Sequence, residues 1–167
     1  MTDQTIPEVP EALDTDVFIT RVFNAPRDVV WKFFTEPEYM ARWFGPAATH
    51  VPVDTVKVEL HEGGRWDLDM VDNESGEHYP IRATLTAVIP PEYLEGNEST
   101  GADTMTPDGH SPITLRIWLH DHGDKTRMTL HQGPFLPEFR DMTVDGWNES
   151  FLKIDAILAA DPKQAGV

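Results

Sequence analysis

Three blocks of different periodicity follow one another along the chain, and their order constrains the fold more than any other feature. Two short helical patterns lie in residues 24–46, strand-like alternation fills residues 51–132, and a long amphipathic pattern follows. A sheet built from the middle block can bury its apolar face only against the helices that bracket it. The sequence therefore predicts one α+β domain, with a curved antiparallel β-sheet wrapped around a long C-terminal helix and two short helices after the first strand.

The first block predicts one strand and two helices. Residues 16–23 are rich in β-branched and aromatic side chains, as in a strand. The first helix begins at Pro26, and it ends at Glu36 because a residue that precedes proline is driven away from helical angles. A second short helix begins at Pro37 and stops at Gly45. Its apolar side contains Tyr39, Met40, Trp43 and Phe44.

In the middle block, apolar and polar residues alternate and predict three strands with one apolar face each. Residues 62–64 and 73–76 supply the turns. Residues 95–111 are rich in Gly, Ser, Thr, Asp and Pro, and we expect them to form a long insertion without regular structure. The apolar faces contain Val56, Val58 and Leu60; then Trp66, Leu68 and Met70; and then Ile81, Ala83, Leu85, Ala87 and Ile89.

A hairpin follows, and its register can be predicted. A turn at His122-Gly123 places the apolar residues of both strands on one face. Trp118 then lies on the opposite face, across from Arg127, where an exposed cation–π contact contributes roughly 0.5–1 kcal/mol. A homodimer surface at Trp118 is the alternative. The expected pairs on the apolar face are Ile117 with Met128, Leu115 with Leu130, and Leu119 with Thr126.

The third block, residues 137–160, predicts a helix of about six turns. Gly146 within this helix costs about 1 kcal/mol relative to alanine, which predicts that another part of the molecule approaches it closely. The helix is expected to close at Asp161-Pro162. Its apolar stripe contains Phe139, Met142, Trp147, Phe151, Ile154 and Leu158.

Composition restricts the compartment and the chemistry. The 167 residues support one domain, with a flexible acidic leader at 1–15, the domain at 16–160 and a tail at 161–167. The absence of cysteine excludes disulfides and thiolate chemistry. The leader lacks the segments of a signal peptide, and no stretch approaches the ~20 apolar residues that span a bilayer, so a cytoplasmic location is expected.

The formal net charge of −16 has the wrong sign for binding a phosphate backbone or an anionic membrane surface. We therefore expect no nucleic-acid partner and no membrane insertion. A solvated surface, an acidic docking face and a high-salt habitat are all consistent with this charge, and composition does not choose among them.

Four short motifs occur in order along the chain. They are Ala25-Pro26 with Val30-Trp31, Trp43-Phe44-Gly45-Pro46, Gly63-Gly64-Arg65-Trp66, and Gly146-Trp147. With the predicted order of elements, they make residues 16–160 resemble the family of the C-terminal domain of activators of the heat-shock chaperone ATPase. That family belongs to the START and birch-pollen-allergen-like (SRPBCC) superfamily of helix-grip folds.

The resemblance implies non-covalent binding of a hydrophobic or aromatic small molecule, such as a lipid or polyketide, in a cavity between the sheet and the C-terminal helix. It implies no metal and no cofactor. An enzyme of the cyclase or hydrolase type, acting on such a ligand, is one alternative, and a chaperone activator is another. A chaperone contact is not expected, because only a short leader stands where the eukaryotic co-chaperones carry an additional N-terminal domain.

By the same resemblance, apolar residues of the concave face line the cavity. Each of them would also serve as ordinary core. Five tryptophans and eight phenylalanines favour an aromatic-lined cavity over packing alone. The expected ligand-binding residues are Trp43, Phe44, Trp66, Leu68, Met70, Leu85, Ile117, Met128, Leu130, Trp147, Phe151 and Ile154.

Catalytic and metal-binding patterns are few. The sequence lacks a nucleophile elbow, a phosphate-binding glycine loop and a zinc-binding helix motif. The run His120-Asp121-His122, with His131 nearby, is a possible metal cluster, but side chains that flank a tight turn point to opposite faces, which favours a solvated hairpin. Asp67 and Asp69 share the polar outer face, and this argues against a general acid and base pair.

Overall fold

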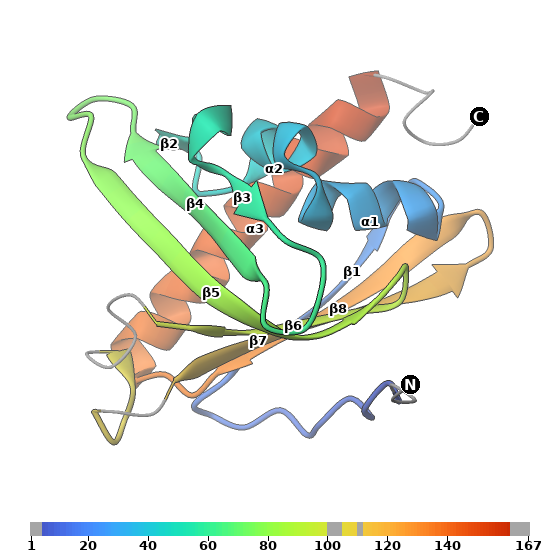
Figure 1. Ribbon diagram of the computed structural model, residues 1–167, viewed down its shortest axis with the longest axis horizontal. Helices are drawn as coiled ribbons and strands as arrows, with labels where there is room; N and C mark the ends of the chain where they lie inside the picture. Colours follow the sequence, from blue (N-terminus) through green and yellow to red (C-terminus); the bar gives the residue numbers. More distant parts are fainter. Residues whose placement is uncertain (1–4, 100–104, 110–111, 161–167) are drawn as a thin grey trace.

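The computed structural model describes residues 5–99, 105–109 and 112–160. An antiparallel sheet curls around the long helix α3 (Pro137–Ala160), and the short helices α1 (Arg27–Thr35) and α2 (Pro37–Trp43) lie on the same concave side (Figure 1). This arrangement is the α+β helix-grip fold that the sequence predicts.

The sheet has eight strands, and all of their pairings are antiparallel. Their order is β1-β8-β7-β6-β5-β4-β2, with β3 paired to β4, so the first strand lies beside the last. A short 3₁₀ turn, η1 (Val53–Thr55), precedes β3. The strands are β1 (Val17–Phe23), β2 (Thr49–His50), β3 (Lys57–Val58), β4 (Arg65–Asp72), β5 (His78–Ile89), β6 (Tyr93–Glu98), β7 (Ile113–His122) and β8 (Lys125–Gly133).

The predicted boundary between α1 and α2 is confirmed. Glu36 has extended angles, with φ −106° and ψ 128°, because it precedes Pro37. Its N–H still donates to the carbonyl of Lys32, which completes the last turn of α1. The chain therefore changes direction at one residue, and this turn brings Trp43 back toward α1.

The predicted register of the β7–β8 hairpin is wrong by two residues. Ile117 pairs with Leu130 and Leu119 with Met128, so the turn is Gly123-Asp124. Gly123 has φ 67°, which fits the first central position of a hairpin turn, where a positive φ is required. A shift by two residues leaves every side chain on its predicted face, because the period of a strand is two.

Trp118 is covered by the N-terminal residues and is 1% exposed. Its indole N–H donates to the carbonyl oxygen of Pro7 at 2.8 Å, and its ring packs on Tyr93. Across the hairpin it faces Thr129. Trp118 therefore does not form the expected exposed cation–π pair with Arg127, and its ring is not free to form a dimer surface. Residues of the leader, which runs along the outer face of the sheet in Figure 1, cover it instead.

A strand lies where the sequence predicts the start of an unstructured insertion. β6 (Tyr93–Glu98) pairs with β5 on one side and with β7 on the other. Because this segment contains polar residues and Gly96, its sequence does not show a clear strand pattern. Pairing with the two neighbouring strands stabilises it. Residues 105–109 form turns, and the remaining part of the predicted insertion lies outside the described residues.

Three further expectations from the sequence, about β5, β3 and α3, are corrected. A bulge between Leu85 and Ala87 reverses the alternation in β5, so that Val88 rather than Ala87 or Ile89 packs against the core. The strand expected at residues 56–60 is only Lys57–Val58, and Leu60 is exposed. Met142, which was expected in the apolar stripe of α3, is 58% exposed.

Candidate ligand-binding site

Five aromatic side chains meet between the sheet and α3, and we call them the aromatic cluster. Phe44 is central: its ring centroid lies 5.1 Å from Trp43, 5.6 Å from Trp66 and 5.3 Å from Trp147. Phe151 stacks on Trp147 at 5.5 Å and on Trp43 at 6.0 Å. The cluster joins α2, β4 and α3, so its residues are distant in sequence.

The last turn of α1 holds two of these indoles in place. Trp43 donates its N–H to the carbonyl oxygen of Phe33 at 2.7 Å, and Trp66 donates to that of Phe34 at 2.8 Å. The last carbonyl groups of a helix have no partner within the helix, so they are available as acceptors. The two hydrogen bonds therefore satisfy buried groups on both sides and orient the rings.

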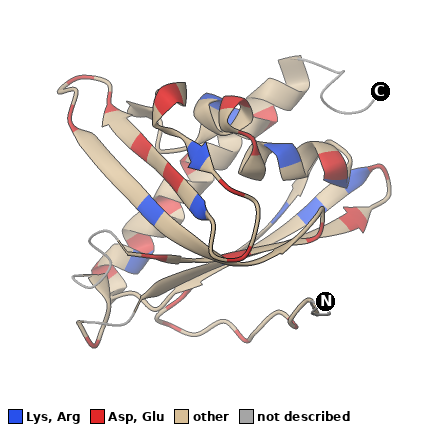
Figure 2. Ribbon diagram, viewed as in Figure 1, with Lys and Arg blue, Asp and Glu red and all other residues tan. Residues whose placement is uncertain are grey.

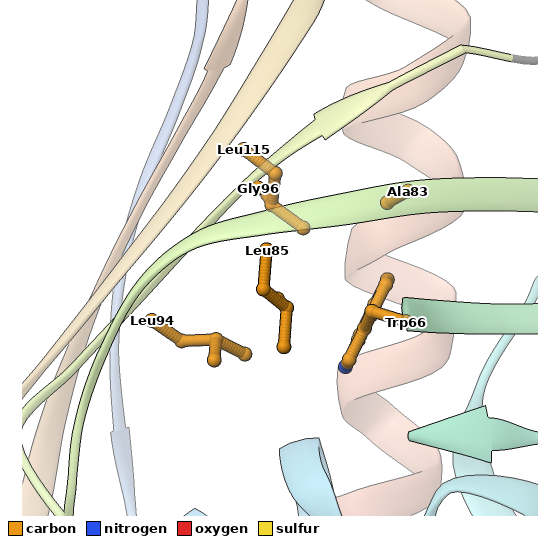
Figure 3. A pocket seen from close by; sticks show the side chains of 6 residues that line it. All are labelled: Trp66, Ala83, Leu85, Leu94, Gly96 and Leu115. Atoms are coloured by element: carbon orange, nitrogen blue, oxygen red, sulfur yellow. The ribbon is translucent and has the colours of Figure 1, made fainter. Parts of the chain in front are cut away.

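A small apolar cavity adjoins the aromatic cluster on the concave face (Figure 3). Its volume of about 10 Å³ is at most that of one water molecule. The lining residues are Trp66, Ala83, Leu85, Leu94, Gly96 and Leu115.

A chain of three polar groups borders this cavity. Trp147 on α3 donates its indole N–H to Gln132 Oε1 at 2.7 Å, and Gln132 Nε2 donates to Glu98 Oε1 at 3.1 Å. Glu98 pairs directly with the cavity residue Ala83, and Gln132 pairs with the cavity residue Leu115. We call Glu98 and Gln132 the polar pair.

Glu98 is a titratable group on the inner side of the sheet. It follows Gly96 by two residues in β6, so both face the concave side. Burial raises the pKa of its carboxyl group to about 7, and the hydrogen bond from Gln132 opposes this rise. Near neutral pH the group therefore exchanges between a carboxylate and a hydrogen-bond donor.

The sequence analysis missed both members of the polar pair. Glu98 fell within the predicted insertion, and Gln132 was outside the residues assigned to the apolar face. The alternation Leu94, Gly96, Glu98 is the one signal that could have placed Glu98 on the inner face. A glycine in the middle of a strand weakens that signal.

The predicted ligand-binding residues form one contiguous core. Trp66 and Leu85 line the cavity, and Met70 is partly buried against the core. The others pack around them and are at most 7% exposed. Those others are Trp43, Phe44, Leu68, Ile117, Met128, Leu130, Trp147, Phe151 and Ile154.

The family of the chain follows from a comparison with known families. Residues 24–159 match the model of a family described as activator of Hsp90 ATPase homolog 1-like protein, AHSA1. This chain belongs to the AHSA1 family. The matched range starts after β1 and ends within the last turn of α3, so it contains both helices of the aromatic cluster.

Solved structures show that the AHSA1 chain shares its fold with bacterial proteins. A protein of Nitrosomonas europaea has a TM-score of 0.73 and 21% identity over 90% of this chain and 97% of that chain. An AHSA1 protein of Silicibacter pomeroyi has a TM-score of 0.69 and 21% identity, over 87% and 98% respectively. A protein of Mycobacterium smegmatis has a TM-score of 0.69 and 24% identity, over 93% and 99%. No curated protein matches the sequence.

The polar residues of the outer face of this AHSA1 protein are ion-paired. Arg65 lies 2.9 Å from Asp67, and Arg82 lies 2.8 Å from Asp69. Figure 2 shows these acidic and basic positions side by side on β4 and β5, with other acidic residues distributed over the helices and loops. The two aspartates, which the sequence analysis placed on the polar outer face, are therefore partners in ion pairs with arginines.

The described histidines of the β7–β8 hairpin have separate surroundings. His131 is buried and its Nε2 lies 2.8 Å from Asp16 Oδ2, which joins the start of β1 to β8. His122 pairs with Lys125 at the hairpin turn, four residues beyond Trp118. Within the described ranges, no group of three or more His, Cys, Asp or Glu side chains is placed to hold a metal ion. In the same ranges, no helix is both long and apolar enough to cross a bilayer.

Proposed function

We propose that this AHSA1 protein binds an apolar or aromatic small molecule between the concave face of the sheet and α3. The observation that carries the proposal is the position of the aromatic cluster beside an apolar cavity. Aromatic side chains from α2, β4 and α3 converge there, and aromatic-lined hollows with few polar groups are typical of small-molecule sites. We propose the twelve core residues named in the sequence analysis as the contacts of the ligand.

Binding requires movement of side chains, because about 10 Å³ is far less than the roughly 300 Å³ of a small-molecule pocket. We propose that Phe44 moves first. It lies just beyond α2 in a connecting loop, it is 5% exposed, and Trp147 beside it is 7% exposed. We propose that rotation of these two rings joins the cavity to the surface.

Three hydrogen bonds hold this loop against α3. Lys153 Nζ donates to the carbonyl oxygens of Pro46 at 3.1 Å and of Thr49 at 3.2 Å. The N–H of Ala47 donates to Glu149 Oε1 at 3.1 Å. Each such bond contributes about 0.5–1.5 kcal/mol, so release of the loop costs an amount that the burial of a small apolar ligand can offset.

The test is binding of naphthylethanol, measured by quenching of tryptophan fluorescence and by native mass spectrometry. Wild-type protein is expected to bind it in a one-to-one complex. Ala83→Leu fills the cavity and should abolish binding, whereas Ala156→Leu makes the same change on the exposed side of α3 and should not. Equal binding by wild type and Ala83→Leu would overturn the proposal, and so would the failure of wild type to bind either this alcohol or an apolar probe of another class.

An enzyme acting on such a ligand is a second candidate, and Glu98 is the observation that favours it. A carboxyl group with a pKa of about 7 is suited to proton transfer at neutral pH. Its hydrogen-bond partner Gln132 does not titrate, and within the described residues no second titratable group pairs with it. If the bound probe is recovered unchanged after prolonged incubation with wild type, the result supports binding alone. If wild type forms a product that Glu98→Gln does not form, the result supports catalysis.

The family description itself supports a third candidate, activation of the Hsp90 ATPase. We give it less weight, because the aromatic cluster and the cavity are internal features that a protein partner does not contact. The direct measurement is the ATPase rate of purified Hsp90 with and without an excess of this protein. We expect no change in that rate; a severalfold stimulation would replace the proposed function with this one.

A further inference from the structure

Glu98 is the acidic member of the polar pair, and the neighbours that the structure describes for it on the inner face are uncharged. Ala83 on β5 and Ile113 on β7 are its cross-strand partners. Gln132 on β8 donates one hydrogen bond to it, and Trp147 on α3 contacts the far end of that amide. Among the described residues, no salt bridge includes Glu98.

Two other acidic groups that are partly or fully buried have different surroundings. Asp16 is paired with His131, and Glu95 on the outer side of β6 lies 3.2 Å from Arg116. An ionised carboxylate inside a protein is costly unless a cation or several hydrogen bonds compensate it. Burial raises the pKa of the Glu98 carboxyl group, and among the described residues one neutral donor and no cation compensate its charge.

The site also has spare capacity for hydrogen bonding. A carboxylate offers four lone-pair sites, and Gln132 Nε2 occupies one of them. The rings of Trp147 and Phe151 are stacked on each other at 5.5 Å, so a cation reaches one of their faces only after these side chains move apart. A carboxylate with spare acceptor sites, beside the cavity residue Ala83, is therefore complementary to an organic cation that carries an apolar body.

We propose that the polar pair is the recognition site for a protonated amine, and that the ligand of this protein is an apolar or arylalkyl amine. The inference rests on the proposed function and specifies its ligand class. The apolar body occupies the region of the cavity and the aromatic cluster, and the ammonium group donates hydrogen bonds to Glu98. The net charge of −16 raises the local concentration of such cations around the protein.

The experiment compares two probes of nearly the same shape, naphthylethylamine and naphthylethanol, on three proteins. Glu98→Gln removes the charge and retains the size of the side chain. Glu62→Gln makes the same change of net charge at an exposed turn and is the control. At pH 8, wild type and Glu62→Gln are expected to bind the amine at least tenfold more tightly than the alcohol, and Glu98→Gln should bind both equally.

A pH profile gives a second readout. The amine stays protonated between pH 6 and 8, whereas the fraction of ionised Glu98 rises about tenfold over this range with a pKa of about 7. Wild-type affinity for the amine should therefore rise about tenfold from pH 6 to pH 8. The affinity for the alcohol, and the affinity of Glu98→Gln for either probe, should change less than threefold.

The outcomes separate the two proposals. If wild type binds the alcohol and the amine with equal affinity, the amine site is wrong and the proposed function stands. A probe preference that survives in Glu98→Gln also overturns the amine site. If wild type binds neither probe, both proposals are wrong. Should Glu98→Gln fail to fold, carboxyl carbon NMR of the wild type decides: the pKa of Glu98 must fall when the amine binds, and an unchanged value contradicts the site.

Discussion

Trp147 and Gln132 are joined by a hydrogen bond of 2.7 Å inside the apolar core, between α3 and β8. An indole N–H can only donate, so it fixes the amide of Gln132 with its oxygen toward α3 and its nitrogen toward Glu98. The orientation of one buried amide thus links the aromatic cluster to the carboxylate. It also determines that Glu98 accepts the hydrogen bond that joins it to Gln132.

Trp147→Phe tests the structural contribution of this bond. The substitution keeps an aromatic ring in the cluster but leaves the buried Gln132 oxygen without a donor, which costs about 1–3 kcal/mol of unfolding free energy. Urea denaturation measures the loss. Trp31→Phe is the control, because Trp31 is also buried and its indole N–H has no partner among the described residues. Equal losses in the two variants would contradict the assignment.

Glu98→Gln tests the cost of the buried charge. The folded-state pKa of about 7 is above the ordinary value, so the folded state binds more protons than the unfolded state between about pH 4.5 and 7. The unfolding free energy contributed by Glu98 therefore falls as pH rises through this window, by on the order of 2–3 kcal/mol. Glu98→Gln should be more stable than wild type at pH 8 and lack this contribution.

The matched measurement is urea denaturation at pH 5 and pH 8 for wild type, Glu98→Gln and Glu62→Gln. The change in unfolding free energy between pH 5 and pH 8 is compared between wild type and Glu98→Gln. The titrating groups that these two proteins share contribute equally to both, so the difference between the two changes gives the contribution of Glu98. Glu62→Gln should follow the wild type. If the pH dependence of Glu98→Gln equals that of wild type, the carboxyl group is not buried in the folded state.

Gly146→Ala should stabilise the protein, contrary to the expectation from the sequence. A Cβ atom added at Gly146 would lie 3.6 Å from Pro46 Cγ, which is an ordinary van der Waals contact. The gain in helix propensity then contributes about 1 kcal/mol. Gly64→Ala is the opposite case, because its Cβ would lie within 2.1 Å of the carbonyl oxygen of Glu59. Thermal unfolding should move the two variants in opposite directions.

Deletion of residues 1–12 should uncover the outer face at Trp118. The hydrogen bond to Pro7 is lost and the indole becomes accessible, with a loss of roughly 2 kcal/mol of unfolding free energy if the ring is fully exposed. Acrylamide quenching and the red shift of tryptophan emission measure the exposure. Deletion of residues 1–4 alone retains Pro7 and serves as the control. Unchanged quenching after the longer deletion would contradict the contact.

Lys153→Met should loosen the loop between α2 and β2. The substitution keeps the aliphatic stem of the side chain and removes both hydrogen bonds to the loop carbonyls. If release of this loop limits access to the interior, the association rate of naphthylethanol should rise severalfold in stopped-flow fluorescence. Lys57→Met, on β3, is the control for the lost charge. An unchanged rate would place the route of access elsewhere.

Much of the fold was predictable because local signals are strong in this chain. Pro26 and the Glu36-Pro37 step define the two short helices, and the range of α3 agrees with its 3.6-residue pattern. Most of the faces in the sheet followed from the period of two. The register of the β7–β8 hairpin could not be predicted in this way, because a shift by two residues satisfies the same pattern. The position of Gly123 in the turn decides between the two registers.

The candidate site was predictable only as a set of apolar residues. Alternation assigned Trp66 and Leu85 to the concave face, but it could not tell a lined cavity from a filled core. β6 escaped the analysis because pairing with β5 and β7, and not its own composition, makes it a strand. With that strand missing, Glu98 had no predicted face, and its partner Gln132 had no predicted role.

The sequence by itself determined the three α-helices, most of the strands and most of their apolar faces, because these depend on residues a few positions apart. Only the tertiary structure decided that five aromatic rings meet between the sheet and α3, that residues near Pro7 cover Trp118, and that Glu98 lies beside the cavity residue Ala83. Packing volume, the covering of a face and the burial of a charge depend on segments that are distant in sequence and adjacent in space. No local pattern encodes them.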